Sequence, residues 1–257
     1  PLTINFSEGS YRDKIDIQPE EVYRRLPTEI PTSSQPSPQE IAEVFERVVA
    51  DGYEKVVAVT ISSGLSGTFD NVSAVARENE NLDVIIIDTL SIGLGAGFTA
   101  IAAGELIARG VAFEELEDKL TNQSLNTKIF FGVETLKYLK AGGRIGEVAY
   151  ILGNLLGIRP IITCGSDGKY HIASKARGRD ASIKRMIDLA RDVAATFREY
   201  NVAVMHGDAA DEVQKILAEV RTLFPRVKEV FTGQISPALV VHTGPGLVGI
   251  GIQGLVR

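Results

Sequence analysis

Residues 55–68 read KVVAVTISSGLSGT: a β-branched apolar run ends in a turn of serine and glycine, and a helical pattern follows from Thr68. Such a run, bounded by turn residues, is typical of a buried strand. Glycine lets backbone approach a ligand, and the first N–H groups of a helix lack partners within it. The turn at 62–68 is therefore predicted to bind an oxyanion, a plain connecting turn being the alternative. Because it lacks the Walker A lysine, a small or singly charged anion suits it better than ATP.

The chain on both sides of this stretch alternates between helix and strand patterns. The predicted elements are a helix from about Gln39, a strand at 84–87, and helices at about 95–109 and 113–121. This alternation favours a parallel sheet covered by helices, with ligands at the carboxyl ends of its strands. Gly93, Gly95 and Gly97 follow the second strand but match a dinucleotide-binding fingerprint only loosely, and they more simply allow close helix packing.

The second half of the chain has a different pattern. Asp167-Gly168 lies between two β-like runs and predicts a hairpin, so antiparallel pairing is expected here. The predicted strands are 128–133, 159–163, 169–174, 202–206, 226–231 and 247–253, and the predicted helices are 134–140, 147–156, 180–200 and 210–223.

The predicted fold is α/β with two domains and a ligand between them. Residues 1–126 are expected to form a mostly parallel sheet flanked by helices, and residues 127–257 an α/β domain with a mixed or antiparallel sheet. The chain opens at Pro1–Phe6 in a strand pattern without Met, which is typical of a truncated or processed chain.

Composition indicates a soluble cytoplasmic protein. The chain has 257 residues, 44% of them hydrophobic and 23% charged, and its apolar stretches are too short to span a membrane. The single cysteine, Cys164, excludes an intramolecular disulfide and is expected in the core. No His, Asp and Glu grouping has ligand spacing, so neither a metal nor another cofactor is expected.

Charge is distributed unevenly along the chain. Residues 128–185 contain eleven Lys or Arg and four Asp or Glu, a balance of +7, which leaves −13 for the remainder of a chain of net charge −6. This predicts a basic face that contacts an anionic ligand or an acidic protein surface. Nucleic acid fits poorly, because the isoelectric point is near 5.3 and no aromatic residues are interleaved with the basic ones.

Six short motifs occur in an order that closely resembles the DegV family. They span nearly the whole chain: Tyr11-Arg12-Asp13, Ser33-Ser34-Gln35-Pro36-Ser37-Pro38, Ser62-Ser63-Gly64-Leu65-Ser66-Gly67-Thr68, Gly142-Gly143-Arg144-Ile145, Lys175-Ala176-Arg177 and His242-Thr243-Gly244-Pro245-Gly246. The resemblance implies a protein that binds a long-chain fatty acid and that, like the B subunit of bacterial fatty acid kinase, presents the carboxylate to a separate ATP-using A subunit. It implies no catalysis by this chain alone, and transient membrane contact for lipid exchange.

The same resemblance assigns roles to individual residues. Ser33, Ser66 and His242 are expected at the carboxylate, which hydroxyls and N–H groups would hold without a buried cation. Arg144 and Arg177 are expected to dock on the kinase subunit. Secondary candidates for the carboxylate are Thr32, Ser63 and Thr68. The family more often has Thr at the position of Ser33 and Ser at that of Gly93. The Asp-Ser-Thr segment of the family's first strand is absent from this sequence, so the resemblance implies that the domain at 1–126 lacks that strand. The residues that line the acyl tunnel are not predicted, since core and tunnel have the same composition.

Two other functions remain open at this point. One is a serine-dependent hydrolase with Ser63 or Ser66 as nucleophile and His242, expected in a Gly/Pro turn, as base, although the hydrolase elbow motif is incomplete. The other is a phospho-ligand-binding enzyme that uses the turn at 62–68 and the basic stretch. Of the other histidines, His171 is expected to be structural and His206 to lie at a strand end.

Overall fold

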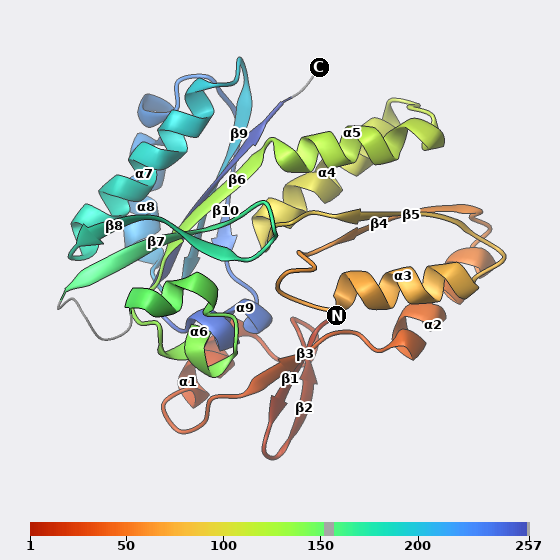
Figure 1. Cartoon of the computed structure of the whole chain (residues 1–257), viewed down its shortest axis with the longest axis horizontal. Coiled ribbons are helices and arrows are strands. Elements are labelled where there is room, and N and C mark those ends of the chain that lie inside the picture. Colours follow the sequence, from red (N-terminus) through yellow and green to blue (C-terminus); the bar gives the residue numbers. More distant parts are fainter. Residues whose placement is uncertain (152–156, 256–257) are drawn as a thin grey trace.

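The computed structural model describes residues 1–151 and 157–255, and these form an α/β fold as predicted (Figure 1). The strands are arranged in three sheets within these ranges. The predicted hairpin around Asp167-Gly168 is confirmed. The helix predicted at 147–156 is a 3₁₀-helix, η1, over Gly146–Ile151, and residues 152–156 of that prediction lie outside the described residues.

The first sheet is small and antiparallel. Its central strand β1 (Thr3–Phe6) pairs with β2 (Gly9–Arg12) and with β3 (Thr32–Ser34). Ser33 pairs with Ile4, a fully buried residue, so the Ser33 side chain points inward while its neighbours on β3 are exposed. Helix α1 (Pro19–Arg25), which the sequence pattern did not predict, packs beside this sheet.

The second sheet is the parallel pair that the alternating pattern predicted, β4 (Lys55–Thr60) and β5 (Asp83–Asp88). Its side chains alternate between two faces, since successive residues of a strand point in opposite directions. Two pairs of helices cover these faces: α2 (Pro38–Ala50) and α3 (Thr68–Glu78) on one, and α4 (Leu94–Ala108) and α5 (Phe113–Leu125) on the other.

The third sheet has six strands in the order β10-β9-β11-β6-β7-β8, and β9 and β10 are its parallel pair. Its strands are β6 (Thr127–Gly132), β7 (Ile158–Cys164), β8 (Tyr170–Arg177), β9 (Tyr200–Gly207), β10 (Val227–Gln234) and β11 (Leu247–Gly254). Helices α7 (Arg179–Ala195) and α8 (Ala210–Leu223) cover one face. Cys164 is buried at the end of β7, as expected, and burial raises its thiol pKa to about 12.

Helix α4 connects the second and third sheets, since it contacts β4 on one side and β6 and β11 on the other. Two short helices, α6 (Lys137–Ala141) and α9 (Pro237–Thr243), lie between the six-stranded sheet and the β1–β3 sheet. The largest apolar cluster fills this space, with side chains from both sheets. The amino end of α4 and helix α9 therefore meet where the three sheets approach one another.

Candidate ligand-binding site

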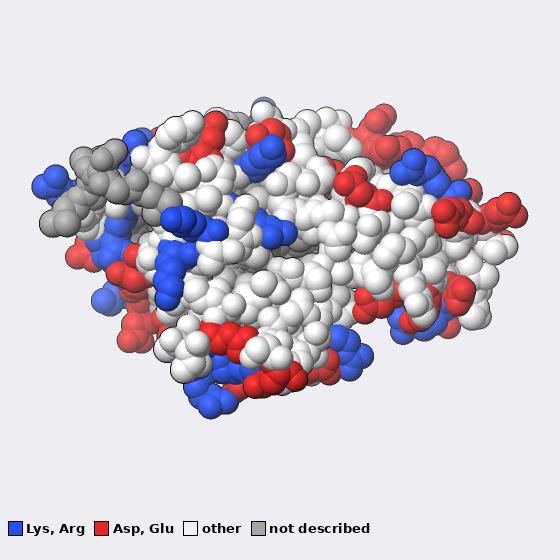
Figure 2. All heavy atoms as spheres, turned by 60° about the horizontal axis from the view of Figure 1, so that its bottom comes forward, with Lys and Arg blue, Asp and Glu red and all other residues white. Residues whose placement is uncertain are grey.

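Four of the residues singled out from the sequence line one polar cavity. Ser33 on β3, Ser66 after β4, Arg144 after α6 and His242 on α9 surround a volume of about 410 Å³. Figure 2 views the molecule from the side of the β1–β3 sheet and shows a hollow near the middle of this face, with a Lys or Arg side chain at one edge. Folding thus brings together residues up to 209 positions apart.

Ser33 and His242 form a direct pair at this cavity. Ser33 Oγ lies 2.7 Å from His242 Nε2. Burial lowers the pKa of His242 to about 4, and the charge of Arg144 acts in the same direction. The imidazole is therefore neutral at pH 7, with a single ring proton to share with Ser33 or a ligand.

His242 lies in the last turn of α9, so its expected place in a Gly/Pro turn is wrong. Pro237 follows Ser236 and starts the helix, and Gly244, with φ +67°, ends it. The ring packs against Gly142, where a Cβ would collide with Nδ1. Nδ1 itself is buried and has no hydrogen-bond partner within the described residues. The absence of a side chain at Gly142 thus makes room for this ring.

Ser66 is oriented by Thr68. The hydroxyl oxygen of Ser66 accepts a hydrogen bond from the Thr68 backbone N–H at 3.3 Å and lies 2.9 Å from Thr68 Oγ1. Thr68, a secondary candidate, therefore supports Ser66 and does not itself line the cavity.

The N–H groups of the turn at 62–68 are largely occupied, which corrects the prediction that they bind an anion. Those of six of its seven residues donate to acceptors within the protein. One of these acceptors is the carboxylate of Asp88, which receives the Ser63 N–H at 3.1 Å and would repel an anion. The Ser66 hydroxyl, and not the backbone, is what the turn offers at the cavity. The occupied N–H groups remove the main support for a phospho-ligand-binding enzyme.

Arg144 lines the cavity, so a partly buried cation lies at a site where no buried cation was expected. Its Nε donates to the Leu65 carbonyl at 3.2 Å and its Nη1 to the Gly142 carbonyl at 2.6 Å. These bonds hold the partly buried guanidinium beside the turn that carries Ser66. A carboxylate bound here would lie near a fixed positive charge.

Other candidates lie elsewhere. Thr32 and Ser63 are exposed and do not line the cavity, and Arg177 is exposed at the end of the edge strand β8. His171 bridges Asp167 and Glu147 at 2.8 Å each, in keeping with a structural role. His206 is on β9, as expected for a strand end, and also lies outside the cavity.

The basic stretch 128–185 does not form a uniformly positive face. Arg159 pairs with Glu134, and Arg179 pairs with Glu212 at 2.6 Å. Figure 2 shows several Lys or Arg side chains grouped to the left of the hollow, with Asp or Glu side chains above and below them.

The geometry does not support a hydrolase built on Ser63 or Ser66. The serine bonded to His242 is Ser33, and in the described part of the chain no carboxylate bonds the other ring nitrogen. A catalytic triad needs an acid there to orient the imidazole and to stabilise its charge. The low pKa of His242 also disfavours the imidazolium that general base catalysis would form.

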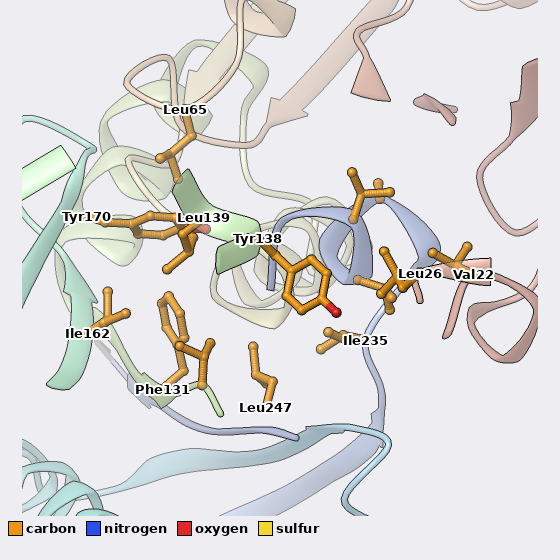
Figure 3. Close-up of a cluster of buried hydrophobic side chains, with 14 of the residues drawn as sticks. Val22, Leu26, Leu65, Phe131, Tyr138, Leu139, Ile162, Tyr170, Ile235 and Leu247 are labelled. Carbon is orange, nitrogen blue, oxygen red and sulfur yellow. The ribbon is translucent and has the colours of Figure 1, made fainter. Parts of the chain in front are cut away.

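A second cavity adjoins the first and is largely apolar. Its volume is about 260 Å³, and it lies between the amino end of α4 and the face of the six-stranded sheet. Figure 3 shows Phe131, Tyr170 and Leu247, from three strands of this sheet, in the interior region that the cavity borders. The two cavities share the lining residues Ile92, Gly93, Tyr170, Ser236 and Leu239.

Several lining residues were not predicted from the sequence. Asp13, within the first family motif, lines the polar cavity, accepts a hydrogen bond from the Ala238 N–H at 3.3 Å and has its pKa raised by burial. Gly249 and Gly251 line the apolar cavity. Their alternation with valine and isoleucine at 247–252 was a usable signal, because a buried strand with glycine on one face leaves space there.

A polar cavity with two hydroxyls, an imidazole and a guanidinium, joined to an apolar cavity, defines an α/β protein suited to an amphipathic ligand with an acidic head. The family model described as "Uncharacterised protein, DegV family" matches residues 1–254. A DegV domain-containing protein of Clostridium acetobutylicum is 38% identical over 250 residues, which cover 97% of this chain and 89% of the relative. This chain therefore belongs to the DegV family.

Solved structures agree with this assignment. A fatty-acid-binding DegV family protein of Thermus thermophilus superimposes with a TM-score of 0.93 at 30% identity, covering 99% of this chain and 91% of that one. A stearic acid-binding protein of Eubacterium ventriosum gives 0.87 at 28% identity, covering 99% and 90%. Fatty acid binding is thus found among DegV structures. Among the described residues, no helix has the length and apolarity needed to cross a membrane.

Proposed function

We propose that this protein binds a long-chain fatty acid, with the carboxylate in the polar cavity and the acyl chain in the apolar one. The observation that carries the proposal is the shared wall: the two cavities meet at Ile92, Gly93 and Tyr170, beside the residues that can hold a carboxylate. The fatty acids bound by the similar structures support this ligand class.

The two parts of the site contribute differently to binding. A hydrogen bond to a charged group contributes about 1.5–3 kcal/mol. Each buried methylene contributes about 0.8 kcal/mol, so a long acyl chain supplies the larger gross share. Ser33, Ser66, His242 and Arg144 would then fix the position of the head, and the apolar cavity would supply most of the affinity.

Mass spectrometry of organic extracts from the purified protein tests the ligand. We expect long-chain fatty acids in the extract and near-stoichiometric uptake of added fatty acid after delipidation. Ser33→Ala and Ser66→Ala should each weaken binding about tenfold or more, through loss of a bond to the carboxylate. Thr32→Ala and Ser63→Ala are matched controls outside the cavity. If folded protein contains no acyl chain and takes none up, the proposal is wrong.

We further propose that the bound carboxylate is presented to a separate kinase subunit. A carboxylate oxygen would attack the γ-phosphorus of ATP, forming the acyl O–P bond while the bond to the bridging oxygen breaks and ADP leaves. Arg144 would hold the carboxylate and counter the repulsion between two anions. The exposed Arg177 is the better candidate for contact with the partner, since it lies outside the cavity.

Two arginine variants separate presentation from binding. Arg177→Ala should lower acyl-phosphate formation with the kinase subunit and leave fatty acid binding unchanged, because its exposed side chain does not line the cavity. Arg144→Ala should lower both, because its guanidinium lines the cavity. If Arg177→Ala lost fatty acid binding as much as acyl-phosphate formation, or left acyl-phosphate formation unchanged, the docking role would be contradicted.

We also propose a cytoplasmic location, which the single, buried cysteine supports.

A further inference from the structure

Strand β11 forms the floor of the apolar cavity. It is the third strand of the six-stranded sheet, paired with β9 on one side and β6 on the other, and it is buried along its whole length. Val248, Ile250 and Ile252 join the apolar cluster against α7 and α8. Because successive positions of a strand face opposite sides of the sheet, Gly249 and Gly251 lie on the side that faces α4 and the cavity.

The register of the three strands arranges this floor in rows. The first row is Met205, Gly249 and Phe131, and the second is Ala203, Gly251 and Ile129. All six residues line the cavity. Each row has a glycine at its centre between two larger side chains, so the floor has a shallow channel along β11. Successive rows are about 6.8 Å apart along the strand.

The third row closes the channel. It consists of Asn201, Gln253 and Thr127, and none of these lines the cavity. Gln253 is buried, accepts a hydrogen bond from Asn201 Nδ2 at 2.8 Å and donates one to the Phe98 carbonyl at 3.0 Å. Moving this bonded amide would leave buried polar groups unpaired, so the row is a firm boundary.

Phe98 of α4 lies above the second row. A Cβ at Gly251 would approach the Phe98 ring at 3.3 Å and Ala203 Cβ at 3.4 Å. Phe98 is fully buried and packs edge-to-face on Phe231, with ring centroids 5.5 Å apart, so it has little freedom to move away. A side chain at position 251 would therefore press against Phe98 and Ala203 and narrow this end of the cavity, which Gly251 lines.

We propose that Gly251 sets the length of acyl chain that the protein accepts, with the methyl end of the chain stopping beside it. This proposal rests on the proposed fatty acid binding and adds to it a selectivity for the length of the acyl chain. A side chain at Gly251 occupies the last part of the channel before the closed third row. Longer chains then lose buried methylenes, whereas shorter chains do not reach that point.

A competition experiment tests this assignment. Delipidated wild type and Gly251→Ala are each incubated with an equimolar mixture of saturated fatty acids from dodecanoic to octadecanoic acid, and the bound acids are quantified by mass spectrometry. Gly251→Ala should shift the distribution toward shorter acids, by about fourfold for each methylene excluded. Gly132→Ala is the matched control, since its Cβ would contact only Ser182 on the opposite face.

A second variant keeps the test decisive if Gly251→Ala does not fold. Ala203→Val adds bulk to the same row from β9 and should give the same shift. An unchanged distribution in folded, loaded variants would overturn the assignment of Gly251. Failure of the wild type to bind any fatty acid would instead overturn the proposed function, so the two failures are distinguishable.

Discussion

At the residue scale, the state of His242 follows from two small neighbours. Ser33 bonds one ring nitrogen, and Gly142 leaves room for the other. Burial and the charge of Arg144 keep the ring neutral. A neutral imidazole beside a serine hydroxyl and a guanidinium can bind a carboxylate without adding a second fixed charge.

Gly142→Ala should weaken fatty acid binding about tenfold, because the methyl group displaces the imidazole from Ser33 and one hydrogen bond to the carboxylate is lost. Gly142 has φ −77°, so alanine fits its backbone. Gly143→Ala is the control: it has φ +71° and therefore strains the backbone, but its Cβ meets no atom within 4 Å. Titration calorimetry measures both, and equal effects would contradict the role of Gly142.

The pKa of His242 predicts a dependence of stability on pH. Its folded pKa of about 4 is below its ordinary 6.5, so the unfolded chain binds a proton more readily. The associated stability is present above pH 6.5 and is lost as pH falls toward 4. The loss should approach about 3 kcal/mol.

Urea denaturation of wild type and His242→Gln across this range measures the effect. The wild type should lose its advantage in free energy of unfolding over the variant as pH falls, and the variant should become the more stable protein if the loss is large enough. His171 also titrates with a shifted pKa, raised mainly by its hydrogen bond to Asp167. Because both proteins contain His171, its contribution cancels in the difference. A difference that does not change with pH would show that His242 is not buried as a neutral group.

At the element scale, the β7–β8 hairpin supports the turn that carries Ser66. The Ser62 hydroxyl donates to the Gly168 carbonyl at 2.7 Å, and a Cβ at Gly64 would lie 2.7 Å from the Asp167 carbonyl. The hairpin and the turn are 106 positions apart in sequence, yet the Ser62 side chain joins them directly. Ser62, which begins the turn, is therefore structural, whereas Ser66 faces the cavity.

Gly168→Ala should destabilise the protein and weaken fatty acid binding, because its Cβ collides with the Ser62 hydroxyl and φ is +72°. Gly110→Ala measures the cost of the positive φ alone, since Gly110 has φ +75° and open space around it. We expect about 1–2 kcal/mol of destabilisation for Gly110→Ala and about 1–3 kcal/mol more for Gly168→Ala. Thermal denaturation compares them, and equal losses would contradict the contact with Ser62.

Local patterns predicted the elements better than the contacts between them. The strand at 55–61, the helix after it and the Asp167-Gly168 hairpin follow from period and turn residues. Helix α9 was missed because its short apolar run has no period that separates helix from strand. We also missed that the N–H groups of the turn at 62–68 are used within the protein, because their acceptors include Asp88, at the end of β5, and Ser91, in the segment after it.

At the scale of the whole molecule, the candidate site lies where three sheets meet. Ser33, Ser66 and His242 were found by resemblance to the DegV family, since they are on separate elements and share no local spacing. The apolar cavity required the pairing of β11 with β6 and β9, which no sequence period reveals. The division into domains at residues 126 and 127 stays a prediction.

The orientation of a bound fatty acid tests the assignment of both cavities. A crystal structure with a long-chain fatty acid brominated at its terminal carbon would locate both ends of the ligand. We expect the carboxylate within hydrogen-bond distance of Ser33 and Ser66, and the anomalous peak of bromine in the apolar cavity beside Gly251. A bromine peak in the polar cavity, or a ligand bound outside both cavities, would contradict this assignment.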